Sequence, residues 1–176
     1  MTDDNSADFE ALRQMGGAVF TAQMFEALFV LVARSALKCP DAKDFDEIAP
    51  FPDKAFKQPV AALVKELGQT GQIDPKLADR INDWVEARHT LVHRLILSKP
   101  HMKNADFWQS MKDLSKTVYV TSTELCLELM EVFVSYAERM PQAKSWLIEN
   151  RESFEAFSKF GKEVRTQVAA GTARHG

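Results

Sequence analysis

The chain has 176 residues, of which 45% are hydrophobic and 27% charged, and its net charge is −3 at pH 7. This composition is ordinary for a globular protein, and the length suits one domain with a well-developed core. The acidic balance argues against a protein that binds nucleic acid through a broad basic surface, although it leaves room for a small basic cleft.

The cysteines and the apolar runs narrow the class of protein further. Cys39 and Cys126 have no CxxC or mixed Cys and His spacing around them, so neither a disulfide scaffold nor a structural zinc site is expected. The polar, acidic N-terminus is unlike a signal peptide. The most apolar run, 22–37, contains charged residues and is short for a membrane span. We expect a cytoplasmic protein with no membrane association.

The first half of the chain is predicted to be helical. Residues 1–6 are expected to form a disordered lead, and apolar side chains then recur at three- and four-residue steps over 7–37, which indicates a helix. A second helix is predicted over 53–67, where Pro59 means that the regular part begins near residue 58 or that the helix bends. Asp74 followed by Pro75 is a clear start signal for a third helix over 75–97.

The second half continues the helical period. A long helix is predicted from 104 or 105 to 139, although its β-branched stretch at 117–123 would also suit a strand. Two C-terminal helices are expected at 143–150 and 153–169, before a disordered tail at 170–176. The sequence therefore predicts one all-α domain over 7–169, a bundle of about five to six helices whose core is formed by 7–140.

The third predicted helix carries an unusual charge at Arg88. At roughly 100° per residue, Arg88 falls near the centre of an apolar stripe, and a buried unpaired guanidinium costs several kcal/mol. It therefore needs a carboxylate, a subunit partner or an anionic ligand. His89 and His93 lie one turn apart on the flank of this stripe, with Glu86 one turn before His89. The stripe consists of Leu77, Ile81, Trp84, Val85, Leu91, Val92 and Leu95.

The spacing in Arg88-His89-Thr90-Leu91-Val92-His93 resembles the signature of the HEPN superfamily, small all-α proteins with an Arg, a polar residue and a His four to six positions after the Arg. The context is similar too, since the motif lies late in an internal helix and a long helix follows. The resemblance covers the motif helix specifically and the bundle over 7–140 generally. It implies a metal-independent endoribonuclease whose site forms from two motif helices across a homodimer interface, often a toxin or defence enzyme with a neutralising partner protein.

Carried over to this chain, the resemblance gives each motif residue a role. Arg88 would hold the scissile phosphate with its planar fork. His93 would move the proton between the ribose 2′-OH and the leaving 5′-oxygen, a task for a group that titrates near neutrality. His89 would orient His93 or the phosphate, or would itself act as acid or base. Arg94 is a candidate second phosphate contact, and Glu26 a candidate partner that supports Arg88.

Several structural interpretations stand beside this one. Arg88 could form a purely structural ion pair with Glu26, and His93 could be a satisfied core or interface histidine. The chain would then be a non-catalytic dimerisation or interaction module. His89, His93 and the nearby Glu86 could also ligate a metal, but the spacing does not match HExxH and no third ligand is evident.

The remaining candidate residues and motifs give weaker evidence of function. Trp84, beside Arg88, could stack on an RNA base, although core packing is the plainer interpretation. Other aromatic residues at helical spacing are predicted to be core. They are Phe20, Phe25, Phe29, Phe107, Trp108 and Phe133. Neither a glycine-rich phosphate loop nor a GxSxG motif is present, so no cofactor is expected.

Overall fold

The computed structural model describes residues 4–43, 58–97 and 105–141, together with isolated positions between 148 and 166. The side chains of residues 4–8 and 94–97 fall outside this description. Within the described residues every regular element is helical and no strand is present. The all-α class predicted from the sequence is therefore confirmed.

Four α-helices and one π-helical turn follow one another in the described part of the chain. They are α1 (Asp4–Val32), the turn η1 (Ala33–Leu37), α2 (Val60–Gln69), α3 (Pro75–Leu97) and α4 (Ala105–Ala137). The predicted helices at 143–150 and 153–169 lie outside the described residues, apart from isolated helical positions. The count of five to six helices, like the disordered tail at 170–176, stays a prediction.

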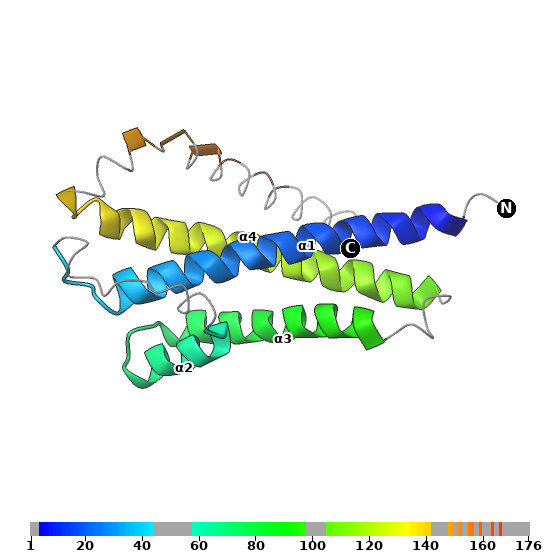
Figure 1. Ribbon diagram of the computed structural model, residues 1–176, viewed down its shortest axis with the longest axis horizontal. Helices are drawn as coiled ribbons and strands as arrows, with labels where there is room; N and C mark the ends of the chain where they lie inside the picture. Colours follow the sequence, from blue (N-terminus) through cyan, green and yellow to red (C-terminus); the bar gives the residue numbers. More distant parts are fainter. Residues whose placement is uncertain are drawn as a thin grey trace.

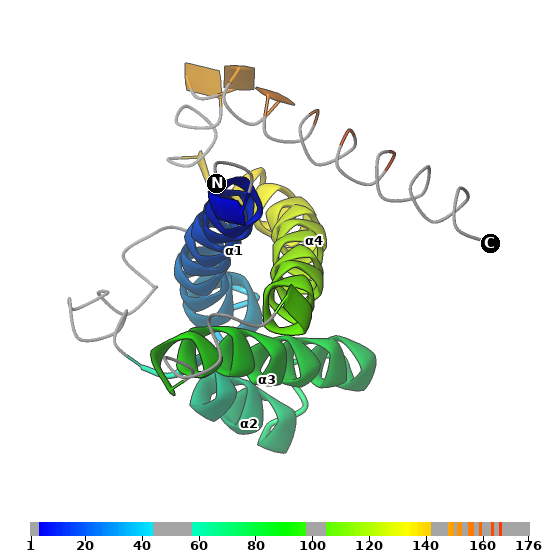
Figure 2. The ribbon, with the colours of Figure 1, turned by 90° about the vertical axis from the view of Figure 1, so that its right-hand side faces the viewer.

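The long helices α1 and α4 lie side by side and run in the same direction (Figure 1). α3 crosses obliquely beneath this pair and runs broadly the opposite way, and α2 packs against α3 (Figures 1 and 2). One hydrophobic core joins the four helices, and its removal from water is the main force that holds them together. The largest fully buried side chains are Trp84, Tyr136, Phe25, Phe29, Leu63, Leu67, Ile81, Leu91, Met111, Leu125, Leu129 and Met140.

α3 has the bounds that its sequence signals predict, from Pro75 to Leu97. The carboxylate of Asp74 accepts a hydrogen bond from the backbone N–H of Leu77 at 3.0 Å, which satisfies one of the free donors of the first turn. Pro75 loses nothing at the first helical position, because its missing N–H would have no partner there. Local chemistry alone thus fixes where the motif helix begins.

α2 is shorter than predicted and starts directly after Pro59. This agrees with the expectation that the regular helix begins near residue 58, while residues 53–57 lie outside the described part. The helix ends at Gln69, and Gly71 then adopts a left-handed conformation with φ of 67°. Only glycine enters this region without a steric cost, so Gly71 allows the chain to turn from α2 into α3.

α1 differs from the prediction at both ends. It begins at Asp4, so part of the lead expected to be disordered over 1–6 is helical. An aspartate in the first turn stabilises a helix N-terminus, which favours this early start. At the other end the helix widens into η1, where the backbone N–H of Lys38 donates to the carbonyl of Ala33 at 3.1 Å. Such π-turns lack a simple sequence signal.

Phe20 is not a core residue, contrary to the prediction. Its side chain on α1 is 62% exposed, whereas Phe25 and Phe29 on the same helix are fully buried. The reason is that α1 is apolar on most of its circumference, so the periodicity of the sequence does not select one inward face. Other large apolar side chains exposed on α1 are Phe9, Leu12 and Met24.

The apolar character of α1 also bears on location. The stretch Phe9–Leu37 is long and apolar enough to cross a membrane by length and composition, and 44% of its most apolar window is buried inside the structure. The central helix of a helical bundle has the same composition, and α1 packs along α4 in that way. Length and composition therefore fit both a membrane span and a core helix.

Cys126 on α4 provides a test of this packing. Burial raises the pKa of its thiol from 9.0 to about 12, because a thiolate is poorly solvated there. The folded state thus keeps the thiol protonated while the unfolded chain ionises above pH 9. We expect the free energy of unfolding to fall by up to about 1.4 kcal/mol per pH unit as the pH rises from about 9 towards 12. Below pH 9 this contribution is fully present.

Urea unfolding of the wild type and Cys126→Ala between pH 7 and 11 checks this prediction. Lysine and tyrosine residues titrate in both proteins, so the difference between them isolates the thiol. If the free energies of unfolding of the two proteins change with pH in parallel, the thiol of Cys126 is exposed to water in the folded state.

Candidate functional site

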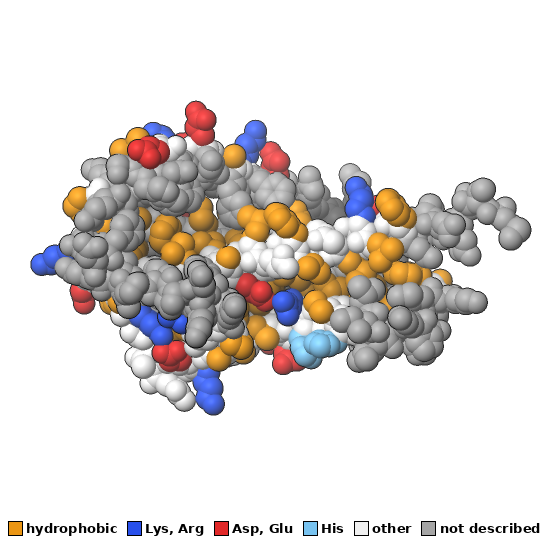
Figure 3. Space-filling model, viewed as in Figure 1, with side chains coloured by type: hydrophobic (Ala, Val, Ile, Leu, Met, Phe, Trp, Pro, Cys, Tyr) orange, Lys and Arg blue, Asp and Glu red, His pale blue; other side chains and the backbone are white. Residues whose placement is uncertain are grey.

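The two motif histidines stand together on the surface of α3. His89 and His93 are both exposed, and their ring centroids are 4.1 Å apart with a tilt of 44° between the ring planes. This follows from their spacing of four residues, which places them one above the other on a helix. Figure 3 shows this face, where the histidine side chains lie at the surface beside charged groups. Two imidazoles are thus presented together to solvent.

Arg88 falls on the apolar stripe of α3 but is not buried. Its side chain is 37% exposed and its Nη2 atom lies 3.2 Å from Oε1 of Glu26, which is 34% exposed. Glu26 projects from α1, so the ion pair joins α1 to the motif helix. Of the three kinds of partner expected for Arg88, a carboxylate is therefore present. Water still reaches both groups, so the full cost of a buried charge does not arise.

A hollow of about 290 Å³ opens next to this ion pair. Arg88 and His89 line it from α3, Glu26 and Val30 from α1, and residues 58–61 from the start of α2. The hollow places a cation, an imidazole and a carboxylate around one space. A small anion such as a phosphate group could enter it only in competition with Glu26 for the guanidinium.

Trp84 belongs to the core. Its side chain is 2% exposed, and its ring meets that of Phe25 edge-on with centroids 4.5 Å apart. The indole N–H donates to Oγ of Ser122 on α4 at 2.8 Å, so its polar atom is satisfied inside the protein. Trp84 also borders the hollow beside Arg88, but a ring that is only 2% exposed has no face free to stack on a base. The structure thus places Trp84 behind the candidate site as support for α3.

The structure says less about two further candidate residues, Glu86 and Arg94. Glu86 is exposed on α3, and within the described residues no hydrogen bond or ion pair links it to His89 or Arg88. The side chain of Arg94 lies outside the described residues, so its role in phosphate binding stays a prediction. No group of three or more His, Cys, Asp or Glu residues that could hold a metal ion is found in the described part.

Gln58 and Arg34 were not identified from the sequence. Gln58 lines the hollow, and its Oε1 atom accepts a hydrogen bond from Nη2 of Arg34 at 2.8 Å. The Nε atom of Arg34 is buried and has no hydrogen-bond partner among the described residues. Arg34 interrupts the apolar run of α1, which is the same kind of signal that singled out Arg88. A second guanidinium thus approaches the rim of the hollow through Gln58.

The Arg88–Glu26 pair is expected to contribute little to stability. Because both side chains are more than a third exposed, water screens their attraction, and comparable pairs contribute about 0–1 kcal/mol. A double-mutant cycle with Arg88→Met and Glu26→Gln, measured by urea unfolding, should give a coupling energy of less than about 1 kcal/mol. A coupling of 3 kcal/mol or more, as for buried pairs, would mean that Arg88 is chiefly structural.

Comparisons with known proteins give no assignment. None of the family models, curated proteins or solved structures compared with this chain matches it. The resemblance to the HEPN superfamily therefore rests on the motif at Arg88 to His93 and on the helical context.

Proposed function

We propose that this chain is a metal-independent endoribonuclease of the HEPN type, which acts as a cytoplasmic homodimer. Arg88, His89 and His93 from two copies would form the composite site. The observation that supports the proposal is their joint placement on α3, with two exposed imidazoles 4.1 Å apart and a partly exposed guanidinium beside them. These are the groups that phosphate-ester cleavage without a metal needs.

The reaction would use the 2′-OH of the RNA as the nucleophile. One imidazole takes the proton from the 2′-oxygen, which attacks the phosphorus, and a protonated imidazole gives a proton to the departing 5′-oxygen. The products are a 2′,3′-cyclic phosphate and a free 5′-OH, so atoms and charge balance without a cofactor. The guanidinium of Arg88 would neutralise the negative charge that builds up on the phosphate. His93 carries the proton in this proposal, and His89 orients it or is its acid–base partner.

The proposed site needs a second copy of the chain, because one copy leaves Arg88 paired with Glu26 and the imidazoles open to water. In one copy the Arg88 guanidinium contacts Glu26, and the imidazoles lie on an open surface where water competes for a phosphate. A second motif helix packed on this face would exclude water and bring a second set of Arg and His side chains. A neutralising partner protein would act by covering the same face.

A second candidate function is a non-catalytic interaction module. The 3.2 Å contact between Arg88 and Glu26 favours it, since a guanidinium occupied by a carboxylate within its own chain is not free for phosphate. In this case the motif helix forms a protein interface, and the histidines contribute surface contacts alone.

Growth of cells that express the protein discriminates between the two functions. We expect the wild type to arrest growth at an expression level at which His93→Ala does not, because only the wild type cleaves cellular RNA. Asn82→Ala, an exposed change on the same helix, is the matched control and should arrest growth like the wild type. Equal growth of all three strains at equal protein levels would contradict a toxin role.

A further inference from the structure

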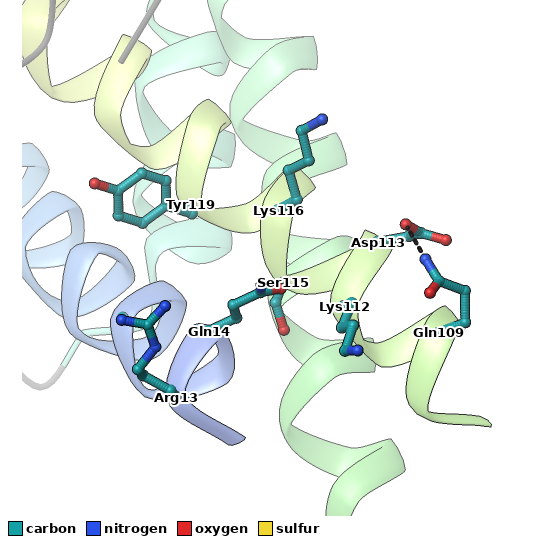
Figure 4. Close-up of a pocket in the computed structure, with 9 residues that line it drawn as sticks. Arg13, Gln14, Gln109, Lys112, Asp113, Ser115, Lys116 and Tyr119 are labelled. Atoms are coloured by element: carbon teal, nitrogen blue, oxygen red, sulfur yellow. Dashed lines mark hydrogen bonds between the residues drawn. The ribbon is translucent and has the colours of Figure 1, made fainter. Parts of the chain in front are cut away.

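The edge of the bundle where α1 meets α4 carries two adjoining hollows. The larger has a volume of about 610 Å³ and the smaller about 250 Å³. Gly17 on α1 and Tyr119 on α4 line both, so the two hollows adjoin, and together they are here called the α1/α4 groove. Figure 4 shows the side chains around its larger part.

The larger part of the groove is cationic. Arg13 of α1 and Lys112 and Lys116 of α4 line it, and Asp113 is the one carboxylate among the described residues that line it. Asp113 accepts a hydrogen bond from Gln109 at 3.1 Å. Within the described part of the chain, no carboxylate forms an ion pair with either lysine. In a protein with net charge −3, this concentration of positive charge is a local exception.

Arg13 is partly neutralised by a neighbour on its own helix. Its guanidinium donates two hydrogen bonds of 2.9 Å to the carboxylate of Glu10. This contact, with a further hydrogen bond from Gln14, holds the pKa of Glu10 below its usual value. The charge of Lys112 also contributes to this lowering, so Lys116 is the lining cation that Glu10 engages least.

The smaller part of the groove is apolar in spite of two threonines in its wall. The hydroxyls of Thr21 and Thr123 donate to backbone carbonyls of their own helices, at 3.0 Å to Ala18 and 2.8 Å to Tyr119. Their methyl groups therefore line the space. The other lining side chains include Phe20, Met24 and the protonated thiol of Cys126.

Gly17 lines both parts of the groove. A Cβ atom built on Gly17 would have no heavy atom within 4 Å, so the fold does not require a glycine there. Its backbone φ is not in the left-handed region either, since Gly71 is the only described residue with positive φ. Glycine inside a helix costs about 1 kcal/mol relative to alanine. The open space beside Gly17 lies where the cationic and the apolar parts adjoin.

We propose that the α1/α4 groove binds a single-chain amphiphilic anion, a long acyl chain with a carboxylate or phosphate head group. The head group would lie between Lys112 and Lys116, and the chain would pass Gly17 into the space between Phe20, Met24 and Cys126. Charge at one end and an apolar surface at the other match this ligand class. A nucleotide or RNA backbone would use the cationic end and leave the apolar part without a function.

This site is separate from the candidate ribonuclease site. Gly17 and Glu26 are nine residues apart on α1, which at roughly 100° per residue places them on opposite edges of the helix. The two proposals can therefore fail independently.

Calorimetric titration of the full-length protein tests the groove. We expect dodecanoate, below its micellar concentration, to bind at one molecule per chain and at least tenfold more tightly than dodecanol, while inorganic phosphate alone shows no measurable binding. Lys112→Glu combined with Lys116→Glu should weaken dodecanoate at least tenfold and change dodecanol less than twofold. Gly17→Leu should weaken both ligands at least tenfold because the leucine fills the space where the two parts adjoin.

Gly16→Leu is the matched control, because Gly16 is the adjacent residue and lines neither hollow. It should bind both ligands like the wild type, and circular dichroism should show all variants to be folded. No binding of dodecanoate by the wild type would overturn the proposal. Equal loss in Gly16→Leu and Gly17→Leu would do the same, as would binding to anionic vesicles without binding to monomeric dodecanoate.

Discussion

Trp84→Ala should lower the free energy of unfolding by about 3–5 kcal/mol, a large part of the total stability of a domain of this size. The ring is almost fully buried between α1 and α4, where it meets Phe25 and hydrogen-bonds to Ser122. Removing it leaves a cavity at the place where the motif helix is held against the bundle. Urea unfolding followed by circular dichroism measures the change.

Trp84→Phe is the control for this prediction. It keeps most of the aromatic packing and removes the indole N–H, and Ser122 keeps its own hydrogen bond to the carbonyl of Val118 at 2.6 Å. We expect less than half of the destabilisation caused by the alanine variant. A loss below 1 kcal/mol in Trp84→Ala would mean that α3 is not anchored through this ring.

His93→Ala should lower the rate of RNA cleavage by about 10²- to 10⁴-fold, the usual contribution of one general acid or base. Because His93 is exposed, its loss should change the free energy of unfolding by less than about 0.5 kcal/mol. Single-turnover cleavage of a defined RNA measures the first effect, and urea unfolding measures the second.

His89→Ala is the matched comparison, since the same ring is removed one turn earlier on the same face. A smaller loss than in His93→Ala would give His89 the orienting role. A larger loss than in His93→Ala would make His89 the principal proton carrier. A wild-type rate in His93→Ala would remove that residue from the mechanism.

The bounds of α3 were predictable because the signals that set them are local. Asp74 and Pro75 act within one helical turn, and the leucine-rich stripe of this helix has a polar flank that leaves one orientation. The β-branched stretch at 117–123 was also predicted correctly as helix, since the apolar period continues on both sides of it. Once folded, its hydroxyls turn back onto their own helix, as Thr123 does to Tyr119.

The orientation of α1 was not predictable in the same way. Phe20 and Phe25 are equally apolar, and only the register of α1 against α4 decides that Phe25 is buried and Phe20 exposed. That register is a property of the packed pair of helices. The cationic part of the α1/α4 groove was not predicted from the sequence for the same reason, because Arg13 and Lys112 are 99 positions apart in the chain.

The residues of the candidate site were predicted better than their exposure to solvent. The need of Arg88 for a carboxylate, and Glu26 as its candidate, followed from two charges that interrupt apolar stretches, and the two side chains do meet. Their exposure did not follow, because helical periodicity gives the direction of a side chain and not the depth of the neighbouring helix. Trp84 shows the same limit, since its spacing suited both a surface ring and the core position that it occupies.

Cleavage of a mixed RNA pool in EDTA is the most direct test of the proposed ribonuclease activity. The proteins to compare are the wild type, Arg88→Ala, Arg88→Lys and His93→Ala, and the oligomeric state of each is recorded. EDTA excludes metal-dependent nucleases, and Arg88→Lys keeps the charge while it removes the planar fork. We expect cleavage by a wild-type dimer, at least 100-fold slower cleavage by the two alanine variants while they stay dimeric, and an intermediate rate for the lysine variant, consistent with roles in charge neutralisation and proton transfer. No cleavage by the wild type, with Arg88→Ala unfolded or monomeric, would contradict the proposal and identify the motif helix as an interaction surface.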